Sequence, residues 1–215
     1  MSDSSPTVFL VDDDPAVRKA LSRVLREEGW HVEVFESAEA FLVRADHVAD
    51  GCLVLDVTMP GLDGLELQQR LIQTGKAMPI VFLTGYGDIP MTVRALKAGA
   101  SDFLTKPVEA QALLRAVGWA IEQGASVRRA RAAIAKLRQR YDGLTPRERE
   151  VLTLLVTGAL NKQIAATLGV VEQTIKFHRA QIMERMEAKT VAELMHIAAR
   201  LEIGTPSDPP AQWQH

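Results

Sequence analysis

The sequence predicts an α/β protein in which a doubly wound, five-stranded parallel sheet is joined by a long helical linker to a small all-helical domain. Within the first 122 residues, short apolar runs alternate with stretches whose apolar residues recur at helical spacing. Five such alternations favour a parallel sheet with helices on both faces. Beyond residue 122 only helical patterns follow, so the second domain is expected to be all α.

Each predicted strand is a short apolar run that ends at turn-forming or polar residues. The five runs are Thr7–Val11, Val32–Phe35, Cys52–Leu55, Ile80–Leu83 and Asp102–Thr105. Helices are expected from Pro15 up to Gly29, after the N-cap candidate Ser37 through Arg44, from about Leu65 to Gly75, and over about Ile89–Lys97. A fifth helix follows the last strand and docks through Leu113, Leu114, Val117 and Ile121.

A helical pattern then extends to about Tyr141, which predicts a semi-rigid helical linker, with residues 124–126 as the candidates for an interruption. The next helix opens with Thr145 as N-cap and Pro146 as its first residue. Further helices are expected over Lys162–Leu168 with Asn161 as cap, over Glu172–Met186, and from Thr190 to Leu201. The predicted division is a first domain at 1–122, the linker at 123–142, the helical domain at 143–204 and a disordered tail at 205–215.

Composition limits the classes of protein to which the chain can belong. An apolar fraction of 47% and a charged fraction of 24% are ordinary for a soluble globular protein. No apolar run reaches the roughly 20 residues that span a bilayer, and the first six residues lack signal-peptide features. The single cysteine, Cys52, excludes an internal disulfide. We therefore expect a cytoplasmic protein with no membrane partner.

The two halves of the chain carry opposite charges. Residues 1–122 contain 11 Lys and Arg against 18 Asp and Glu, a balance of −7, and residues 123–215 contain 14 against 9, a balance of +5. An acidic module joined to a basic one indicates that the second half binds a polyanion. Because +5 is a modest charge, this indication depends on a nucleic-acid-binding motif.

Polar side chains follow four of the predicted strands: Asp12 and Asp13, Asp56, Thr84, and Lys106. The carboxyl ends of parallel strands share one edge of an open α/β sheet, where ligands bind, so these side chains are expected to meet in one cleft. Three carboxylates a few ångströms apart repel one another unless a divalent cation neutralises them. Oxygen ligands favour a hard ion, which indicates Mg²⁺ or Mn²⁺.

The same cluster is suited to phosphoryl chemistry. The carboxylate that is best aimed into the cleft can attack phosphorus and become an acyl phosphate. Lys106 can then pair with the phosphoryl oxygens, and the Thr84 hydroxyl can donate to one of them. The alternative is an aspartate-nucleophile phosphatase, in which Asp12 attacks and Asp14 serves as the acid.

This stretch resembles the CheY-like receiver domain of two-component response regulators over nearly all of residues 5–122. The matching motifs are Val-Asp-Asp-Asp at 11–14, Leu-Asp-Val-Thr-Met-Pro-Gly-Leu-Asp-Gly at 55–64, Leu-Thr-Gly-Tyr-Gly-Asp at 83–88 and Lys-Ala-Gly-Ala-Ser-Asp-Phe-Leu-Thr-Lys-Pro at 97–107. The resemblance implies that a sensor histidine kinase phosphorylates Asp56, with Thr84 and Lys106 binding the phosphoryl group. It assigns Mg²⁺ to Asp12, Asp13, Asp56 and the backbone carbonyl of Thr58.

The resemblance also implies a switch that converts phosphorylation into a change of surface. Thr84 moves toward the phosphoryl group and Phe103 swings into the vacated space, whereas the alternative makes Phe103 only a core aromatic. The adjoining helix and strand form the usual dimer surface of activated receivers, which in this chain carries Met91, Val93, Arg94, Lys97 and Asp102. A homodimer is therefore expected when the protein is phosphorylated.

Two helices joined at residues 169–171 form a helix-turn-helix pattern. The motifs Leu-Thr-Pro-Arg-Glu-Arg-Glu-Val-Leu at 144–152, Asn-Lys-Gln-Ile-Ala at 161–165 and Thr-Ile-Lys-Phe-His-Arg at 174–179 resemble the LuxR-type DNA-binding domain. The candidate contacts with double-stranded DNA are Lys162, Gln173, Thr174, Lys176, Phe177 and Arg179. Ala180 departs from the family, which often has a basic residue there, so the resemblance does not imply a target sequence.

Together the two modules resemble the NarL/FixJ group of response regulators, with a FixJ-like receiver. The implied function is phosphorylation-controlled binding to promoter DNA, with RNA polymerase as a further partner and activation of transcription favoured over repression. Such a receiver acts on no metabolite and catalyses only its own phosphoryl transfer and dephosphorylation. The remaining alternative is a receiver that acts only through protein partners.

Overall fold

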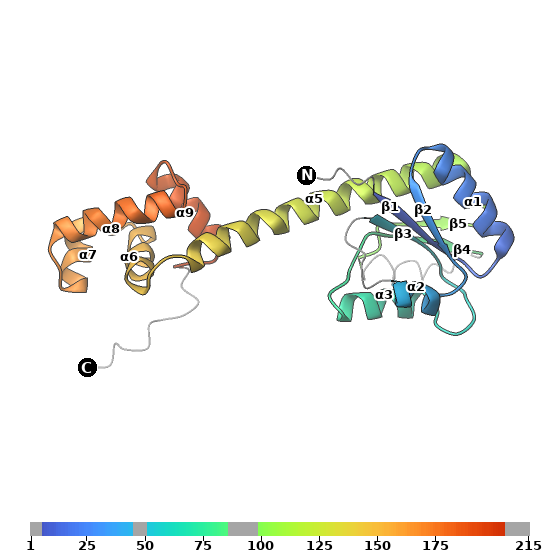
Figure 1. Cartoon of the computed structure of the whole chain (residues 1–215), viewed down its shortest axis with the longest axis horizontal. Coiled ribbons are helices and arrows are strands. Elements are labelled where there is room, and N and C mark those ends of the chain that lie inside the picture. The colour runs from blue at the N-terminus through green and yellow to red at the C-terminus, as the bar shows by residue number, and fades with distance from the viewer. Residues whose placement is uncertain (1–5, 45–50, 86–98, 205–215) are drawn as a thin grey trace. The chain divides into compact units, whose positions relative to one another are not determined.

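A computed structural model describes residues 6–44, 51–85 and 99–204. They belong to two compact units, Met1–Arg128 and Arg129–His215, whose elements are labelled in Figure 1. The helix predicted over residues 89–97 lies outside the described residues. Among the residues that are described, no helix has both the length and the apolar character that crossing a membrane requires.

The first unit contains a five-stranded parallel sheet in the order β2-β1-β3-β4-β5. This confirms the predicted sheet. Its strands are β1 (Thr7–Val11), β2 (His31–Phe35), β3 (Gly51–Asp56), β4 (Ile80–Thr84) and β5 (Asp102–Thr105). Because the chain leaves β1 toward β2 and later returns to β3 on the other side of β1, the switch point of the sheet lies between β1 and β3.

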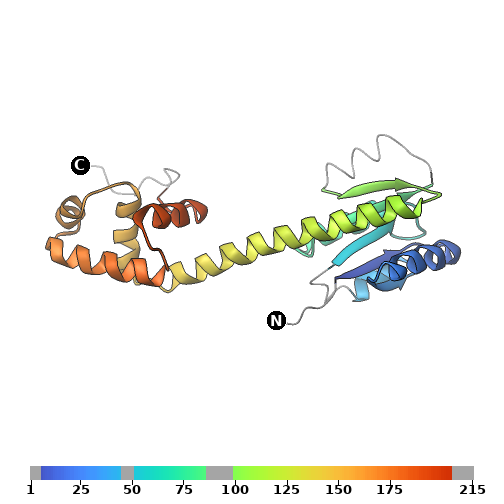
Figure 2. The same cartoon turned by 90° about the horizontal axis from the view of Figure 1, so that it is seen from above.

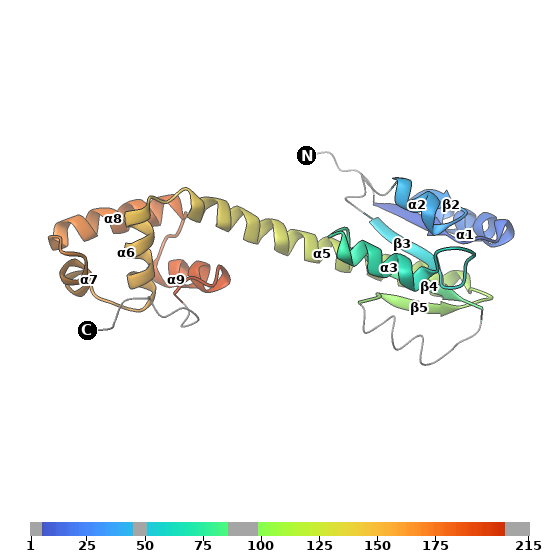
Figure 3. The same cartoon turned by 90° about the horizontal axis from the view of Figure 1, so that it is seen from below.

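Helices cover both faces of this sheet. They are α1 (Pro15–Glu27), α2 (Ala38–Arg44), α3 (Gly64–Gln73) and the first turns of α5 (Ala110–Asp142). Because side chains alternate along a strand, successive residues enter opposite cores. Val8 and Leu10 pack toward α1 and α5, which lie in front of the strands in Figure 2. Phe9 and Val11 pack toward α2 and α3, which lie in front in Figure 3.

Helix α5 continues without a break from Ala110 to Asp142, so the interruption considered for residues 124–126 is absent. Gly124 is instead a packing residue, because a Cβ at this position would lie 2.6 Å from Cγ of Pro79. Near the other end of α5, Leu137 and Tyr141 pack into the core of the second unit. A single helix therefore contributes to both units.

The described part of the second unit is all helical. After the end of α5 it consists of α6 (Pro146–Val156), α7 (Asn161–Leu168), α8 (Glu172–Arg185) and α9 (Val191–Arg200). Helices α6 and α7 both pack on α8, and their core includes Val151, Leu152, Ile164, Ile175, Ile182, Met186 and Leu194. Gly169 ends α7 in the left-handed conformation, with φ of 65°, which allows the tight turn into α8.

The start of α7 differs from the prediction. Asn161 is the first helical residue and not the cap, because Leu160 occupies the N-cap position. The Gln163 side chain accepts a hydrogen bond from the Leu160 backbone N–H at 2.8 Å. A glutamine that reaches back thus satisfies the backbone at this helix start, where the sequence suggested an asparagine cap.

Candidate functional site

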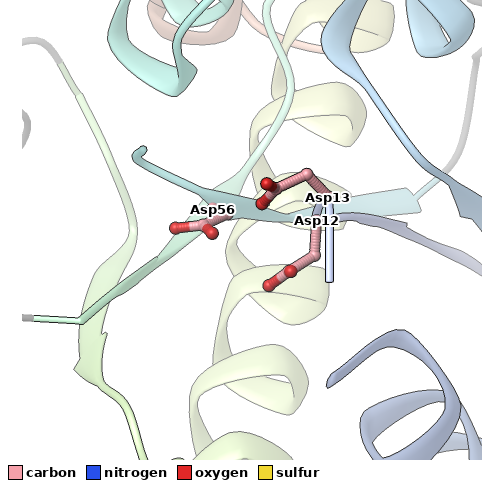
Figure 4. Close-up of side chains that lie close together, drawn as sticks. All are labelled: Asp12, Asp13 and Asp56. Atoms are coloured by element: carbon pink, nitrogen blue, oxygen red, sulfur yellow. The ribbon is translucent and has the colours of Figure 1, made fainter. Parts of the chain in front are cut away.

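Three aspartates converge at the carboxyl ends of β1 and β3 (Figure 4). Asp12 follows β1 and Asp56 ends β3, and the parallel pairing of Val11 with Leu55 sets them side by side. Asp12 and Asp56 are buried, whereas Asp13 is exposed. One carboxylate oxygen from each aspartate lies within 4.8 Å of the other two. The expected meeting of the three acids is therefore present.

Lys106 brings a positive charge to this cluster from the segment that follows β5. Its Nζ atom lies 2.7 Å from Oδ2 of Asp12 and 2.7 Å from Oδ2 of Asp56. Its backbone N–H donates to the carbonyl of Thr84 at 2.6 Å. Burial acts to lower the pKa of Lys106, but the close negative charges of Asp12 and Asp56 outweigh burial, and the pKa is raised. The ammonium is therefore charged at neutral pH.

Asp12 has features that suit a cation ligand. Burial raises the pKa of its carboxyl, although Lys106 and the backbone N–H of Asp14 oppose this effect. Its Oδ2 atom is buried and, among the described residues, receives no hydrogen bond of normal geometry, even though the Lys106 ammonium is close. Such an oxygen fits a hard divalent cation. Together with Asp13 and Asp56 it forms an acidic cluster typical of Mg²⁺ binding.

Hydrogen bonds hold the loops that carry these acids. Arg18 of α1 donates to the backbone carbonyl of Asp12 at 2.7 Å. The backbone N–H of Thr58, whose carbonyl is the expected fourth metal ligand, donates to Oδ1 of Asp56 at 3.2 Å. Sequence reasoning identified the acids but not Arg18, because nothing in a helical pattern indicates which side chain reaches back to a neighbouring loop.

The two residues of the expected switch lie on adjacent strands. Thr84 ends β4 and is buried. Phe103 pairs with Phe82 across β4 and β5, and their ring centroids are 6.0 Å apart. Phe103 is only partly buried and packs against the core on the α2 and α3 face. This position agrees with a core aromatic, and its movement as a switch stays a prediction.

The expected dimer surface is only partly described. Met91, Val93, Arg94 and Lys97 lie outside the described residues. Asp102 begins β5 and is partly buried, and its Oδ1 accepts from the N–H of Phe103 at 2.8 Å. Its carboxylate thus has a local role at the start of the strand, and its role between subunits stays a prediction.

In the second unit, α7 and α8 present the expected DNA-contacting side chains. Ile175 is buried in the core, while Phe177, two residues later, is 62% exposed. The Lys176 ammonium is exposed and lies 3.4 Å from Glu172 of the preceding turn. Of the remaining candidates, Lys162 and Gln173 are exposed and Thr174 is partly buried. Most of the expected set therefore lies on the surface of these two helices.

Arg179 differs from the other candidates. Its guanidinium donates to Oδ1 of Asn161 at 3.4 Å and is partly buried, so it joins α8 to the start of α7. Leu160 and Val171, the N-cap residues of α7 and α8, are both 69% exposed. Sequence reasoning did not predict this exposure. These apolar residues make no side-chain cap.

Comparison with known families finds one match in each of the two units. Residues 8–118 match the model described as "Response regulator receiver domain". Residues 142–198 match the model described as "Bacterial regulatory proteins, luxR family". The chain is a NarL/FixJ-type response regulator. The recognised motifs and the resemblance to this group are thereby confirmed.

Relatives of this response regulator align along nearly its whole length. It is 42% identical to response regulator protein TmoT of Ectopseudomonas mendocina, over 94% of this chain and 92% of the relative. It is 39% identical to transcriptional regulatory protein FixJ of Bradyrhizobium diazoefficiens, over 90% and 94%. Among solved structures, response regulator StyR is similar with a TM-score of 0.82 and 47% identity, over 92% of this chain and all of that one.

The two alternative functions are not favoured for this response regulator. In a phosphatase Asp14 would be the acid, but its Oδ1 accepts from the N–H of Ala16 at 2.7 Å and caps α1. A receiver that acts only through protein partners does not account for the match of residues 142–198 to a DNA-binding family. The chain is a transcription regulator, not a metabolic enzyme.

Proposed function

We propose that Asp56 is the phosphoacceptor of this response regulator and that a sensor histidine kinase phosphorylates it. The observation that carries the proposal is the position of the Lys106 ammonium, 2.7 Å from both Asp12 and Asp56. A lysine that pairs with two carboxylates in the resting protein is also placed to pair with phosphoryl oxygens after transfer. Of the three acids, Asp56 is part of a strand, whereas Asp12 and Asp13 follow β1, and sites on strands are more precise than sites on loops.

In the proposed reaction, an Oδ atom of Asp56 attacks the phosphorus of a phosphohistidine. The P–N bond breaks, and its electron pair returns to the imidazole nitrogen, which takes up a proton. Lys106 and the Thr84 hydroxyl hold the phosphoryl oxygens. Mg²⁺ or Mn²⁺, held by Asp12, Asp13, Asp56 and the carbonyl of Thr58, supplies charge neutralisation when bound. The receiver catalyses only this transfer and the later hydrolysis of its own acyl phosphate.

The proposed output is dimerisation and binding to promoter DNA in the cytoplasm, with recruitment of RNA polymerase and activation of transcription. Movement of Thr84 and Phe103 would change the surface formed by Met91, Val93, Arg94, Lys97 and Asp102, through which two receivers pair. The LuxR-type match supports the DNA-binding step. The name of FixJ, a transcriptional regulatory protein, supports the effect on transcription.

The proposal assigns each step to a segment of the chain. Residues 1–122 receive the phosphoryl group, 123–142 link the domains, 143–204 bind DNA, and 205–215 form the tail. Within the DNA-binding domain, Phe177 and Lys176 would enter the major groove. Phosphate contacts would come from Lys162 and Thr174, with Gln173 and Arg179 as further DNA contacts.

Mass spectrometry after incubation with acetyl phosphate and Mg²⁺ tests the first step. Wild type is expected to gain one phosphoryl group on Asp56 and Asp56→Asn none, while Asp63→Asn, at another carboxylate of the same domain, should still be phosphorylated. Sedimentation and binding to duplexes selected from a random-sequence library then test the output. A stable adduct on Asp12, or equal dimer content with and without phosphorylation, would contradict the proposal.

A further inference from the structure

Glu39 makes a hydrogen bond that links α2 to the loop between β3 and α3. Its Oε1 atom accepts from the backbone N–H of Leu62 at 3.0 Å, although 23 residues separate the two. The hydrogen bond from its own backbone N–H, followed by that from Leu62, holds the pKa of Glu39 below its ordinary value. The acceptor is therefore a carboxylate at neutral pH, and its bond to Leu62 is charge-assisted.

The backbone of this loop is shaped to receive the Glu39 carboxylate. Gly61 has a φ of 80°, and a Cβ on this residue would lie 2.9 Å from Oε1 of Glu39. On the inner side of the loop, Met59 and Leu62 are buried in the same core as Phe41 of α2. The loop thus shares an apolar core with α2, and the Glu39 hydrogen bond adds a polar contact between the two segments.

The same loop carries one of the expected metal ligands. Thr58 lies four residues before Leu62, and its N–H donates to Oδ1 of Asp56 at 3.2 Å. The loop ends at Asp63, whose side chain caps α3 by accepting from the N–H of Glu66 at 2.7 Å. Leu62 lies between Asp56 and Asp63, and its hydrogen bond to the Glu39 side chain connects this part of the loop backbone to α2.

We propose that Glu39 is a positioning residue for the metal site: its bond to Leu62 would hold the loop that carries Thr58, whose backbone carbonyl would be a ligand of the cation. This inference rests on the proposed function, in which that carbonyl is a ligand. Residues that orient metal ligands from outside the coordination sphere typically change metal affinity by about 10–100-fold when they are removed. Glu39 holds the loop through Leu62, so its effect would be on the geometry of the loop.

Titration calorimetry of the full chain with MgCl₂ tests this proposal. Glu39→Ala is expected to weaken Mg²⁺ binding about 10-fold. Glu39→Gln keeps an oxygen that can accept from Leu62 and should bind Mg²⁺ nearly as wild type does. Glu39→Asp keeps the charge but is one methylene shorter, so it should resemble Glu39→Ala. Glu36→Ala, an exposed glutamate three residues earlier, is the matched control and should leave the affinity unchanged.

Thermal unfolding in EDTA separates positioning from general stability. The proposal expects the three Glu39 variants to unfold within a few degrees of wild type, while their Mg²⁺ affinities divide by whether the bond to Leu62 is kept. It is overturned if Glu39→Ala and Glu39→Asp both bind Mg²⁺ as wild type does, or if Glu39→Gln is as weak as Glu39→Ala. If wild type itself binds no Mg²⁺, the metal site of the proposed function fails instead.

Discussion

Lys106 and Asp56 are 50 residues apart in the chain, yet Nζ of the lysine lies 2.7 Å from Oδ2 of the aspartate. The contact spans the central strand β3 and the edge strand β5, with β4 between them. In the resting protein, the lysine compensates part of the negative charge that Asp12, Asp13 and Asp56 bring to this edge. After phosphorylation the same ammonium would face a dianion.

Replacing Lys106 with methionine removes this charge and keeps most of the side-chain volume. Because a preorganised charge acts on the phosphoryl group as its own negative charge develops, we expect phosphorylation of Asp56 by acetyl phosphate to slow by about 100-fold. The rate is measured by separating phosphorylated and free protein on phosphate-affinity gels. Lys19→Met, at an exposed position on α1, is the control and should keep the wild-type rate. An unchanged rate in Lys106→Met would exclude this role.

Mg²⁺ should stabilise the first unit, because the cation binds the folded acids and not the unfolded chain. At a concentration ten times its dissociation constant, the gain is about 1.4 kcal/mol in the free energy of unfolding. Asp13→Asn removes one carboxylate of the cluster and should abolish most of this gain. Asp14→Asn keeps a good cap for α1 and should retain it. Urea denaturation with Mg²⁺ or EDTA measures the difference, and equal responses of the two variants would argue against Asp13 as a ligand.

The sheet and the acid cluster were predictable because both follow from regular geometry. Continuous apolar runs such as Val8–Val11 are typical of strands buried on both faces. Once the strands are parallel, residues at their carboxyl ends share one edge, so Asp12 and Asp56 must lie close together. The same reasoning brought Lys106 to the site, since it follows the last strand at the same edge.

Contacts that depend on the reach of one side chain were not predictable. The Glu39–Leu62 bond joins α2 to a loop, and the Arg179–Asn161 bond joins α8 to the start of α7. In both cases the hydrophobic pattern does not determine how the two segments lie relative to each other. The long helix α5 was predicted to extend to about Tyr141, but the sequence left open an interruption at residues 124–126 that the structure does not have. Glycine lowers helix propensity, but at Gly124 the close approach of Pro79 leaves no room for a Cβ, so tertiary packing outweighs propensity.

Glu148 should make the second unit sensitive to acid. Burial acts to raise the pKa of its carboxyl, but hydrogen bonds from the N–H and hydroxyl of Thr145, with the charge of Arg185, outweigh burial and hold the pKa below its ordinary value of 4.5. The unfolded chain therefore takes up this proton more readily than the folded one. The stabilisation is present above about pH 4.5 and is lost as the pH falls through the lower pKa of the folded state.

Glu148→Gln removes the titrating group, so the free energy of unfolding should fall less steeply with acid than in wild type. Urea denaturation of the second unit, followed by helical circular dichroism from about pH 7 to about pH 3, measures this slope. Glu150→Gln changes an exposed glutamate on the same helix and should leave the slope as in wild type. A Glu148→Gln variant with the wild-type slope would show that another group controls the acid response.

Ile175 and Phe177 are two residues apart on α8 but face different surroundings, since the first is fully buried and the second is 62% exposed. Ile175→Ala should lower the free energy of unfolding by about 2–5 kcal/mol, because it leaves a cavity in the core. Phe177→Ala should change stability by less than about 0.5 kcal/mol. If Phe177 contacts a base in the major groove, the variant should bind a selected duplex about 10-fold more weakly.

Fluorescence anisotropy with that duplex, at several salt concentrations, separates two kinds of DNA contact. Loss of an apolar contact by Phe177→Ala should lower affinity without changing the salt dependence. Lys176→Ala should reduce the slope of log affinity against log salt by about 1 if the lysine binds a phosphate, and should leave the slope unchanged if it reads a base edge. If Phe177→Ala binds the duplex with wild-type affinity, the exposed ring of Phe177 does not contact the DNA.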